Sequence, residues 1–228
     1  MSKAYLFGDS IAKGVIFDES RGRYALCRER CTNLLLQSGV DLEPHARMGA
    51  TIEDGYAAFC ETETQPGGVC VIEFGGNDCD IDWAAVAAAP DEPYDARVPL
   101  ERFACLLDVF IREARARGLQ PMLVTPVPLV SDRYFDWVTR GLDSAAVLRA
   151  LGDREHIYRW QERYAQAVRE AAARNRCPLI DLRRGFLEAR RFTDLMCVDG
   201  IHPNADGQAL MARIILQSLP DYRRQLGA

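Results

Sequence analysis

The chain has 228 residues, 48% of them hydrophobic and 27% charged, which indicates a globular protein with a sizeable core and excludes a disordered chain. The net charge of -5 leaves no excess of Lys and Arg to bind a phosphate backbone, so nucleic acid is not expected as a partner. No window approaches the roughly 18 to 20 apolar residues of a membrane span. The amino terminus also lacks the long apolar region of a secretory signal, which predicts a cytoplasmic location.

The chain alternates short apolar runs with helical patterns along its whole length. In chain order, the apolar runs predict strands at 3–7, 40–46, 69–74, 121–127 and 177–182. Apolar periodicity predicts helices at 21–38, 51–62, 100–117, 155–175 and 204–218. Strands separated by helices form βαβ units, so we expect an α/β fold with a five-stranded parallel sheet. Because no repeat or linker interrupts the pattern, residues 1–228 are expected to form one domain.

Two stretches exceed this minimal alternation of strand and helix. Residues 79–99 and 128–154 each follow a predicted strand and precede a long helix. Loops at the carboxyl ends of parallel strands line the crevice in which such sheets bind ligands. These two insertions are therefore the predicted substrate-shaping regions.

The eight cysteines are scattered without a C-x-x-C pair or zinc-like spacing. Cys27 and Cys31 share one face of a predicted helix, but no second cluster accompanies them. Because no export signal is present, reduced and mostly buried thiols are expected, and no metal site is predicted.

Three polar motifs stand out from the apolar pattern. The letters "FGDS" end at Ser10 after the first strand, "FGGND" contains Asn77 after the third, and "VDGIHPN" contains Asp199 and His202 before the last helix. Each motif by itself is also a good turn or helix cap. Asp9 is expected to secure its turn through backbone hydrogen bonds.

The expected sheet order brings these motifs to one edge. In a sheet ordered 2-1-3-4-5, strands one and three meet at the topological switch point, so Ser10 and Asn77 face each other across a crevice. The last loop can return over this edge, where Asp199 holds Nδ1–H of His202 and leaves Nε2 to accept the Ser10 proton. Oxyanion donors are then the Ser10 N–H, the Asn77 amide and the N–H of Gly49, which follows strand two.

Four blocks, "FGDSIAKG", "ARMGATI", "FGGND" and "DGIHPN", resemble those of the SGNH hydrolases, the GDSL-type esterase and lipase superfamily. The resemblance spans nearly the whole chain and departs from the common pattern in having Ile after the serine where Leu is frequent. It implies a flavodoxin-like three-layer α/β/α sandwich and ester hydrolysis without a metal or organic cofactor. It also implies catalytic roles for Ser10, His202 and Asp199 and an oxyanion hole of Ser10, Gly49 and Asn77.

The substrate is a weaker inference from the sequence. Trp83, Tyr134 and Trp137 lie in the two insertions, and with Asp78 they are the predicted substrate-binding residues. Four further acidic side chains lie in the same stretches: Asp80, Asp82, Asp132 and Asp136. Such a surface suits a short acyl group on a small polar or sugar alcohol. The alternative is that these aromatic rings only pack the insertions onto the sheet.

Other functions stay open at this point. A lipase or lysophospholipase needs a broad apolar groove, against which the acidic insertions argue, and a noncatalytic binding protein keeps the crevice but not the turnover. A nucleotide-dependent reaction has no support, since no G-x-G-x-x-G motif occurs. A solvated face, rather than a surface for a protein partner, is expected for Arg183, Arg184, Arg190 and Arg191. His45 and His156 are expected to be structural.

Overall fold

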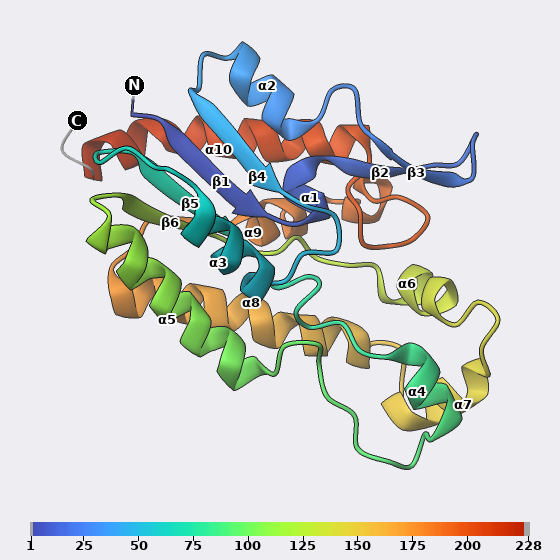
Figure 1. Cartoon of the computed structure of the whole chain (residues 1–228). Helices are drawn as coiled ribbons and strands as arrows, with labels where there is room; N and C mark the ends of the chain where they lie inside the picture. Colours follow the sequence, from blue (N-terminus) through green and yellow to red (C-terminus); the bar gives the residue numbers. More distant parts are fainter. Residues whose placement is uncertain (1, 226–228) are drawn as a thin grey trace.

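A five-stranded parallel sheet forms the centre of the molecule (Figure 1). The computed structural model describes the backbone of residues 2–225 and the side chains of residues 2–219. In spatial order the strands are β4 (Leu42–Ala46), β1 (Ala4–Gly8), β5 (Val69–Glu73), β6 (Gln120–Val124) and β7 (Leu179–Ile180). Every pairing between neighbours in this sheet is parallel. The predicted order 2-1-3-4-5 is therefore confirmed, although β7 is shorter than predicted.

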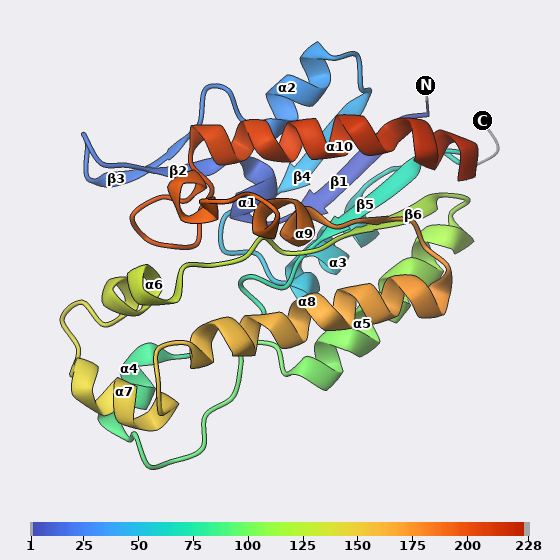
Figure 2. The same ribbon diagram turned by 180° about the vertical axis from the view of Figure 1, so that it is seen from behind.

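Helices cover both faces of this sheet (Figures 1 and 2). One face carries α3 (Ile52–Glu61), α5 (Leu100–Ala116) and α8 (His156–Asn175). The other carries α2 (Cys31–Gln37), α9 (Leu182–Leu187) and α10 (Ala205–Gln225). Successive side chains of a strand point to opposite faces, so Tyr5 and Phe7 pack under the first layer while Leu6 faces the second. The three-layer α/β/α fold is confirmed.

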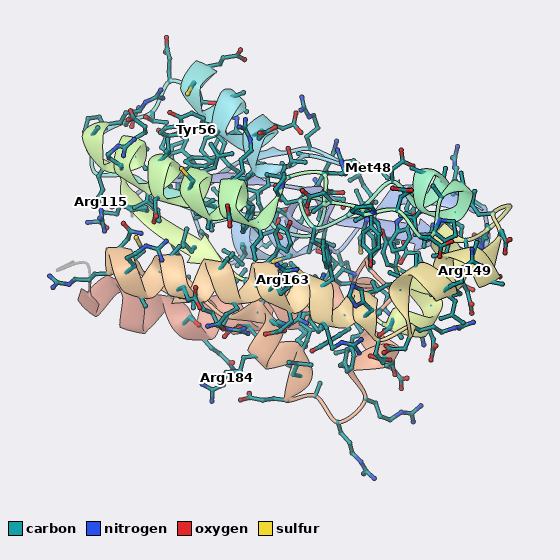
Figure 3. All side chains as sticks on the ribbon, turned by 90° about the horizontal axis from the view of Figure 1, so that it is seen from below. Met48, Tyr56, Arg115, Arg149, Arg163 and Arg184 are labelled. Carbon is teal, nitrogen blue, oxygen red and sulfur yellow. The ribbon has the colours of Figure 1, made fainter. Side chains whose placement is uncertain are left out.

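The two long helices α5 and α8 lie against each other on the first face (Figure 3). On α5, Phe103, Leu107 and Phe110 are buried at spacings of four and three residues, which places them on one side of the helix. The arginines Arg115 and Arg163, labelled in Figure 3, lie on the exposed sides of the two helices. Burial of the apolar stripe against the sheet is what stabilises both helices, as their periodicity predicts.

The two insertions form a separate group of short helices at one end of the sheet (Figures 1 and 2). Residues 79–99 contain α4 (Trp83–Ala88), and residues 128–154 contain α6 (Ser131–Val138) and α7 (Ser144–Leu151). They enclose a small core of their own, which includes Leu129, Phe135, Val147, Leu151 and Ile157. The insertions therefore extend the fold beyond the sheet's carboxyl edge.

The prediction of a helix over residues 21–38 is wrong in its first half. Residues 15–26 form an antiparallel hairpin of β2 (Val15–Asp18) and β3 (Arg23–Leu26), and the helix begins only at Cys31. The turn is made by Asp18, whose carboxylate accepts from the N–H of Ser20, and by Gly22 in the left-handed region at φ +60°. The hairpin projects from the side of the sheet beside α10 (Figure 1).

Arg183 was expected to lie on a solvated face, but its side chain is fully buried. Its guanidinium lies between the sheet edge and α8, where Nη1 donates to Oε1 of Gln161 and Nε pairs with Glu162. Arg184 does lie in solvent and pairs with Glu188 one helical turn away. Within residues 2–225, no helix is long and apolar enough to cross a membrane, and the cytoplasmic location stays a prediction.

Candidate active site

Ser10 begins the short helix α1 (Ser10–Lys13), directly after β1. Asp9 caps this helix, since its Oδ1 accepts from the N–H of Ile11 at 2.7 Å. The preceding Gly8 pairs with Glu73 across the sheet, and a Cβ at Gly8 would come within 2.8 Å of a Glu73 carboxylate oxygen. The turn from strand to helix is therefore tight, and it presents the Ser10 hydroxyl at the carboxyl edge of the sheet.

His202 and Asp199 complete a continuous hydrogen-bonded array with Ser10. The His202 Nε2 atom lies 2.9 Å from Ser10 Oγ, and Nδ1 lies 2.6 Å from Asp199 Oδ2. A carboxylate can only accept, so Nδ1 carries the proton and Nε2 is free to accept from the serine. All three side chains are buried. The sequence placed these residues together, and the structure brings them within hydrogen-bond distance.

Burial acts to raise the pKa of Asp199, but its surroundings outweigh this effect. The hydrogen bond and charge of His202, together with the backbone N–H groups of Ile201 and His202, hold the pKa of Asp199 below its ordinary value. Asp199 therefore stays ionised and can stabilise an imidazolium at His202.

The loop that carries this pair is fastened to the start of α6 by hydrogen bonds to its backbone carbonyl groups. Val130 N–H donates to the carbonyl of Gly200 at 2.8 Å, and Arg133 Nη1 donates to the carbonyls of Thr193 and Met196. Gly200 has φ +78°, a conformation that glycine adopts without strain. The position of His202 thus depends on the second insertion.

Asn77 lies beside Ser10, but its amide is already engaged. Nδ2 donates to Asp9 Oδ2 and to the carbonyl of Ala50, both at 3.1 Å. Asp9 therefore does more than cap α1, because it also orients the Asn77 amide. To serve an oxyanion, one of these N–H groups must be shared with it or turned from its present acceptor.

Gly49 lies in the turn between β4 and α3, next to the Ala50 carbonyl that binds Asn77. It has φ +76°, and no atom lies within 4 Å of where a Cβ would be. The turn is held near the nucleophile because Arg47 N–H donates to the Gly8 carbonyl. Gly49 thus lies at the same edge of the sheet as Ser10 and Asn77.

Asp78 does not reach the substrate side of this edge. It is fully buried, with Oδ1 accepting from Ile52 N–H at 2.8 Å and Oδ2 from Gly75 N–H at 2.9 Å. Both carboxylate oxygens therefore serve to join the start of α3 to the turn that carries Asn77. We accordingly no longer assign Asp78 to substrate binding.

Three buried carboxyl groups gather behind the nucleophile. Burial, the largest influence on each, raises the pKa of Asp9 to about 6 and that of Asp78 to about 7, and raises the pKa of Glu73 well above its ordinary value. The negative charge of Asp9 raises the pKa of Glu73 further. Glu73 accepts from the Asp9 N–H at 3.3 Å, so the cluster is directly bonded to the residue before Ser10.

This cluster predicts a stability that falls as pH rises. An acid whose pKa is raised on folding binds its proton more tightly in the folded state, so stability is lost between its unfolded pKa near 4 and its folded pKa. His156, whose pKa burial lowers, contributes the opposite slope but is a single group. We expect the free energy of unfolding to fall by about 2 kcal/mol or more from pH 5 to pH 8, measured by urea denaturation.

The matched variants for this test are Glu73→Gln and Glu43→Gln. Glu73→Gln keeps an acceptor for the Asp9 N–H and removes a titrating group, so the fall should become smaller. The pKa of Glu43 is lowered by its hydrogen bond to Lys3, so Glu43→Gln should leave the slope between pH 5 and pH 8 unchanged. Equal slopes in wild type and Glu73→Gln would contradict the assignment.

A small cavity of about 90 Å³ opens beside Ser10. Asp9, Ser10 and Asn77 line it together with side chains from α4, α6, α7 and α8. Four aromatic residues contribute to its wall: Trp83, Tyr94, Tyr134 and Trp160. The insertions thus supply much of the wall of this cavity.

The aromatic wall is organised by one carboxylate, Asp80. Its Oδ1 accepts from the Tyr134 hydroxyl at 2.8 Å and from Trp83 Nε1 at 2.9 Å. Burial raises the pKa of Asp80, whereas these two donors lower it. His156, expected to be merely structural, also lines the cavity, with Nε2 3.3 Å from the Tyr94 hydroxyl.

The remaining residues expected at the substrate lie outside the cavity. Trp137 packs its ring against Phe17 at 4.7 Å between centroids and beneath the Arg140 guanidinium. Of the acids, Asp82 caps α4, while Asp132 and Asp136 pair with Arg154 in solvent. These side chains are held by partners within the protein, whereas Trp83, Tyr134 and Asp80 line the cavity.

Nothing in the described part of the chain groups three or more His, Cys, Asp or Glu side chains in a way that could hold a metal ion. The eight cysteines are free thiols, and Cys27 lies before α2 rather than on a helix face shared with Cys31.

The comparisons with known proteins agree with this geometry. The sequence model of the GDSL-like lipase/acylhydrolase family matches residues 6–210. A search of curated proteins finds no match. Among solved structures, a lipase/acylhydrolase from Enterococcus faecalis is similar, with a TM-score of 0.62 and 21% identity, covering 96% of this chain and 95% of that one.

Two further structures share the fold at low identity. A GDSL-like lipase from Bacteroides thetaiotaomicron VPI-5482 has a TM-score of 0.64 and 15% identity, with 97% of this chain and 89% of that one covered. An acetyl xylan esterase has a TM-score of 0.61 and 19% identity, with 95% and 99% covered. At these identities the likeness concerns the fold alone.

Proposed function

Because the chain belongs to the GDSL-like lipase/acylhydrolase family and is thus an ester hydrolase, we propose that it cleaves short acyl esters of small polar or sugar alcohols through an acyl-enzyme on Ser10. The observation that carries this proposal is the unbroken hydrogen-bonded array from Ser10 Oγ through His202 to Asp199. Ser10, the first member of the array, lines the cavity in which we place the ester.

The reaction proceeds in two steps. His202 Nε2 accepts the Ser10 proton as Oγ attacks the ester carbonyl, and a tetrahedral oxyanion forms. His202 then gives this proton to the departing alcohol oxygen, and the carbonyl re-forms as the acyl-enzyme. Water next loses a proton to His202 and attacks the acyl carbon. Collapse of the second tetrahedral intermediate releases the acid and returns the proton to Ser10.

Three donors surround the place where the oxyanion forms. We assign this role to the N–H groups of Ser10 and Gly49 and to the amide of Asn77. In support, loop 47–50 contacts both Gly8 and Asn77, which keeps these donors at one edge. Asp9 and the Ala50 carbonyl hold the Asn77 amide at this edge, and one of its two N–H groups is shared with the oxyanion or turned toward it when charge develops.

The walls of the cavity support a ring-bearing polar alcohol as the leaving group. Flat aromatic faces offer apolar contact to a sugar ring, while a few polar groups fix its orientation. Trp83, Tyr134 and Trp160 provide such faces, and Asp80 and Gln161 are polar groups of the same wall.

Replacing Trp83 by alanine tests this assignment. We expect KM for an acetylated sugar to rise about tenfold, since a stacking contact worth about 1 kcal/mol or more is lost. KM for ethyl acetate, which has no ring, should stay within twofold of wild type. Steady-state kinetics on both substrates measure this difference. Equal changes for the two esters would remove the ring of the alcohol from the proposal.

Longer acyl groups are the second candidate. A larger apolar cavity of about 440 Å³ lies between the sheet and helices α2 and α10, lined by residues such as Leu35, Met122 and Met211. Glu73 is shared by the two cavities and stands between them. A series of p-nitrophenyl esters from acetyl to dodecanoyl, with Ser10→Ala as the blank, separates the candidates: a maximum at acetyl supports the first, and one at long chains supports the second.

A further inference from the structure

We propose that Tyr24, on the hairpin of β2 and β3, is a positioning residue for the His202–Asp199 pair, an inference that rests on the proposed function. The Tyr24 ring lies over the His202 imidazole, with 5.1 Å between centroids and 58° between the planes. Tyr24 lies outside the four sequence blocks that carry Ser10, Gly49, Asn77 and the Asp199–His202 pair, in a segment where the sequence predicted a helix.

The hairpin is docked on the loop that carries the pair. The N–H of Phe17 on β2 lies 3.4 Å from Cys197 Sγ, two residues before Asp199. Across the hairpin, Phe17 is the β-sheet partner of Tyr24, and their rings meet edge to face at 5.4 Å. Contact of the hairpin with Cys197 thus fixes where the Tyr24 ring lies.

Trp137 of α6 completes the support from the other side. Its ring lies 4.7 Å from that of Phe17 and 6.1 Å from that of Tyr24. Burial raises the pKa of Tyr24 and the nearby Asp199 carboxylate raises it further, whereas the Trp137 indole lowers it. The phenol hydroxyl therefore lies close to the Asp199 carboxylate and to the Trp137 indole.

This arrangement limits the freedom of the imidazole in two ways. The Tyr24 ring covers one face of His202 and hinders rotation of the side chain away from Ser10. The hydroxyl places a polar O–H group near Asp199, whose oxygens already accept from His202 Nδ1 and two backbone N–H groups. Tyr24 does not line the substrate cavity, so its effect should fall on the proton transfer and not on substrate binding.

The experiment compares Tyr24→Phe, Tyr24→Leu and wild type in the full chain. Tyr24→Phe keeps the ring and loses the donor, and we expect kcat to fall about fivefold with KM unchanged. Tyr24→Leu loses both, and we expect a fall of about fiftyfold. The rate of Ser10 labelling by a small fluorophosphonate should fall by the same factors, because it depends on activation of the serine and not on the ester.

The matched control is Tyr56→Phe, which removes a tyrosine hydroxyl from α3 in the helical layer seen in Figure 3. Its ring packs on Phe59 and Phe110, and we expect wild-type kcat and labelling. Wild-type labelling of Tyr24→Phe, or a loss confined to KM, would overturn the inference. If Tyr24→Leu fails to fold by circular dichroism, Tyr24→Phe decides alone. If wild type itself is not labelled, the proposed function fails instead.

Discussion

Replacing Ser10 by alanine is expected to lower kcat/KM for p-nitrophenyl acetate by about a thousandfold or more. The hydroxyl is the group that His202 Nε2 faces at 2.9 Å, and alanine removes it without enlarging any side chain. Donors for the oxyanion remain, so a residual rate above that of water is expected. Steady-state hydrolysis measures the loss, and circular dichroism checks that the variant is folded.

Ser38→Ala is the control for this variant. Ser38 lies at the end of α2 in solvent, where its hydroxyl donates to the Leu34 carbonyl, far along the chain from the site. Wild-type turnover is expected for it. Turnover by folded Ser10→Ala within tenfold of wild type would show that another group attacks the ester.

A methyl group at position 200 is expected to displace the His202 loop and lower kcat/KM by about a hundredfold. In Gly200→Ala the new Cβ would lie 2.7 Å from the Val130 carbonyl oxygen and 2.8 Å from Tyr134 N, both backbone atoms at the start of α6. The left-handed φ of +78° adds strain. We expect the free energy of unfolding to fall by about 2 to 4 kcal/mol.

Gly141→Ala distinguishes the effect of backbone strain from that of a steric clash with α6. Gly141 has φ +76°, almost the same as that of Gly200, but no atom lies within 4 Å of its added Cβ. We expect a loss of about 1 kcal/mol from backbone strain alone and unchanged turnover. Urea denaturation and steady-state kinetics on both variants make the comparison. If the two alanine variants behave alike, contact with α6 does not position the loop.

The sheet and the Ser10–His202–Asp199 array at its edge could be predicted from the sequence because both depend on local signals. Buried parallel strands are short apolar runs between helical stripes, and they are recognisable without knowledge of their partners. Polar residues follow the first and third predicted strands, whose carboxyl ends share one edge of the sheet. The βαβ order brings the "DGIHPN" block to the same edge. Ser10, Asn77, Asp199 and His202 could therefore be selected before any contact was known.

Long-range contacts decide the parts that the sequence did not reveal. The strands of the hairpin are four residues long and half exposed, so residues 15–26 show no clear alternation. Arg183 looks like part of a solvated run, and its burial is explained by partners distant in sequence, which are Gln161 and Glu162 on α8 and the Val127 carbonyl. Trp137 lies in the expected insertion but points to the hairpin, which the sequence did not show.

The distance along the chain between Ser10 and His202, 192 residues, has a consequence for the order of folding. Gln208 on α10 ties the two ends together, because its Oε1 accepts from Cys31 N–H and its Nε2 donates to the Ile11 carbonyl. Closing so long a loop comes after local helices form. On the proposed mechanism, Ser10 is therefore not activated until α10 docks and brings His202 to it, and recovery of activity during refolding should follow the formation of local helices.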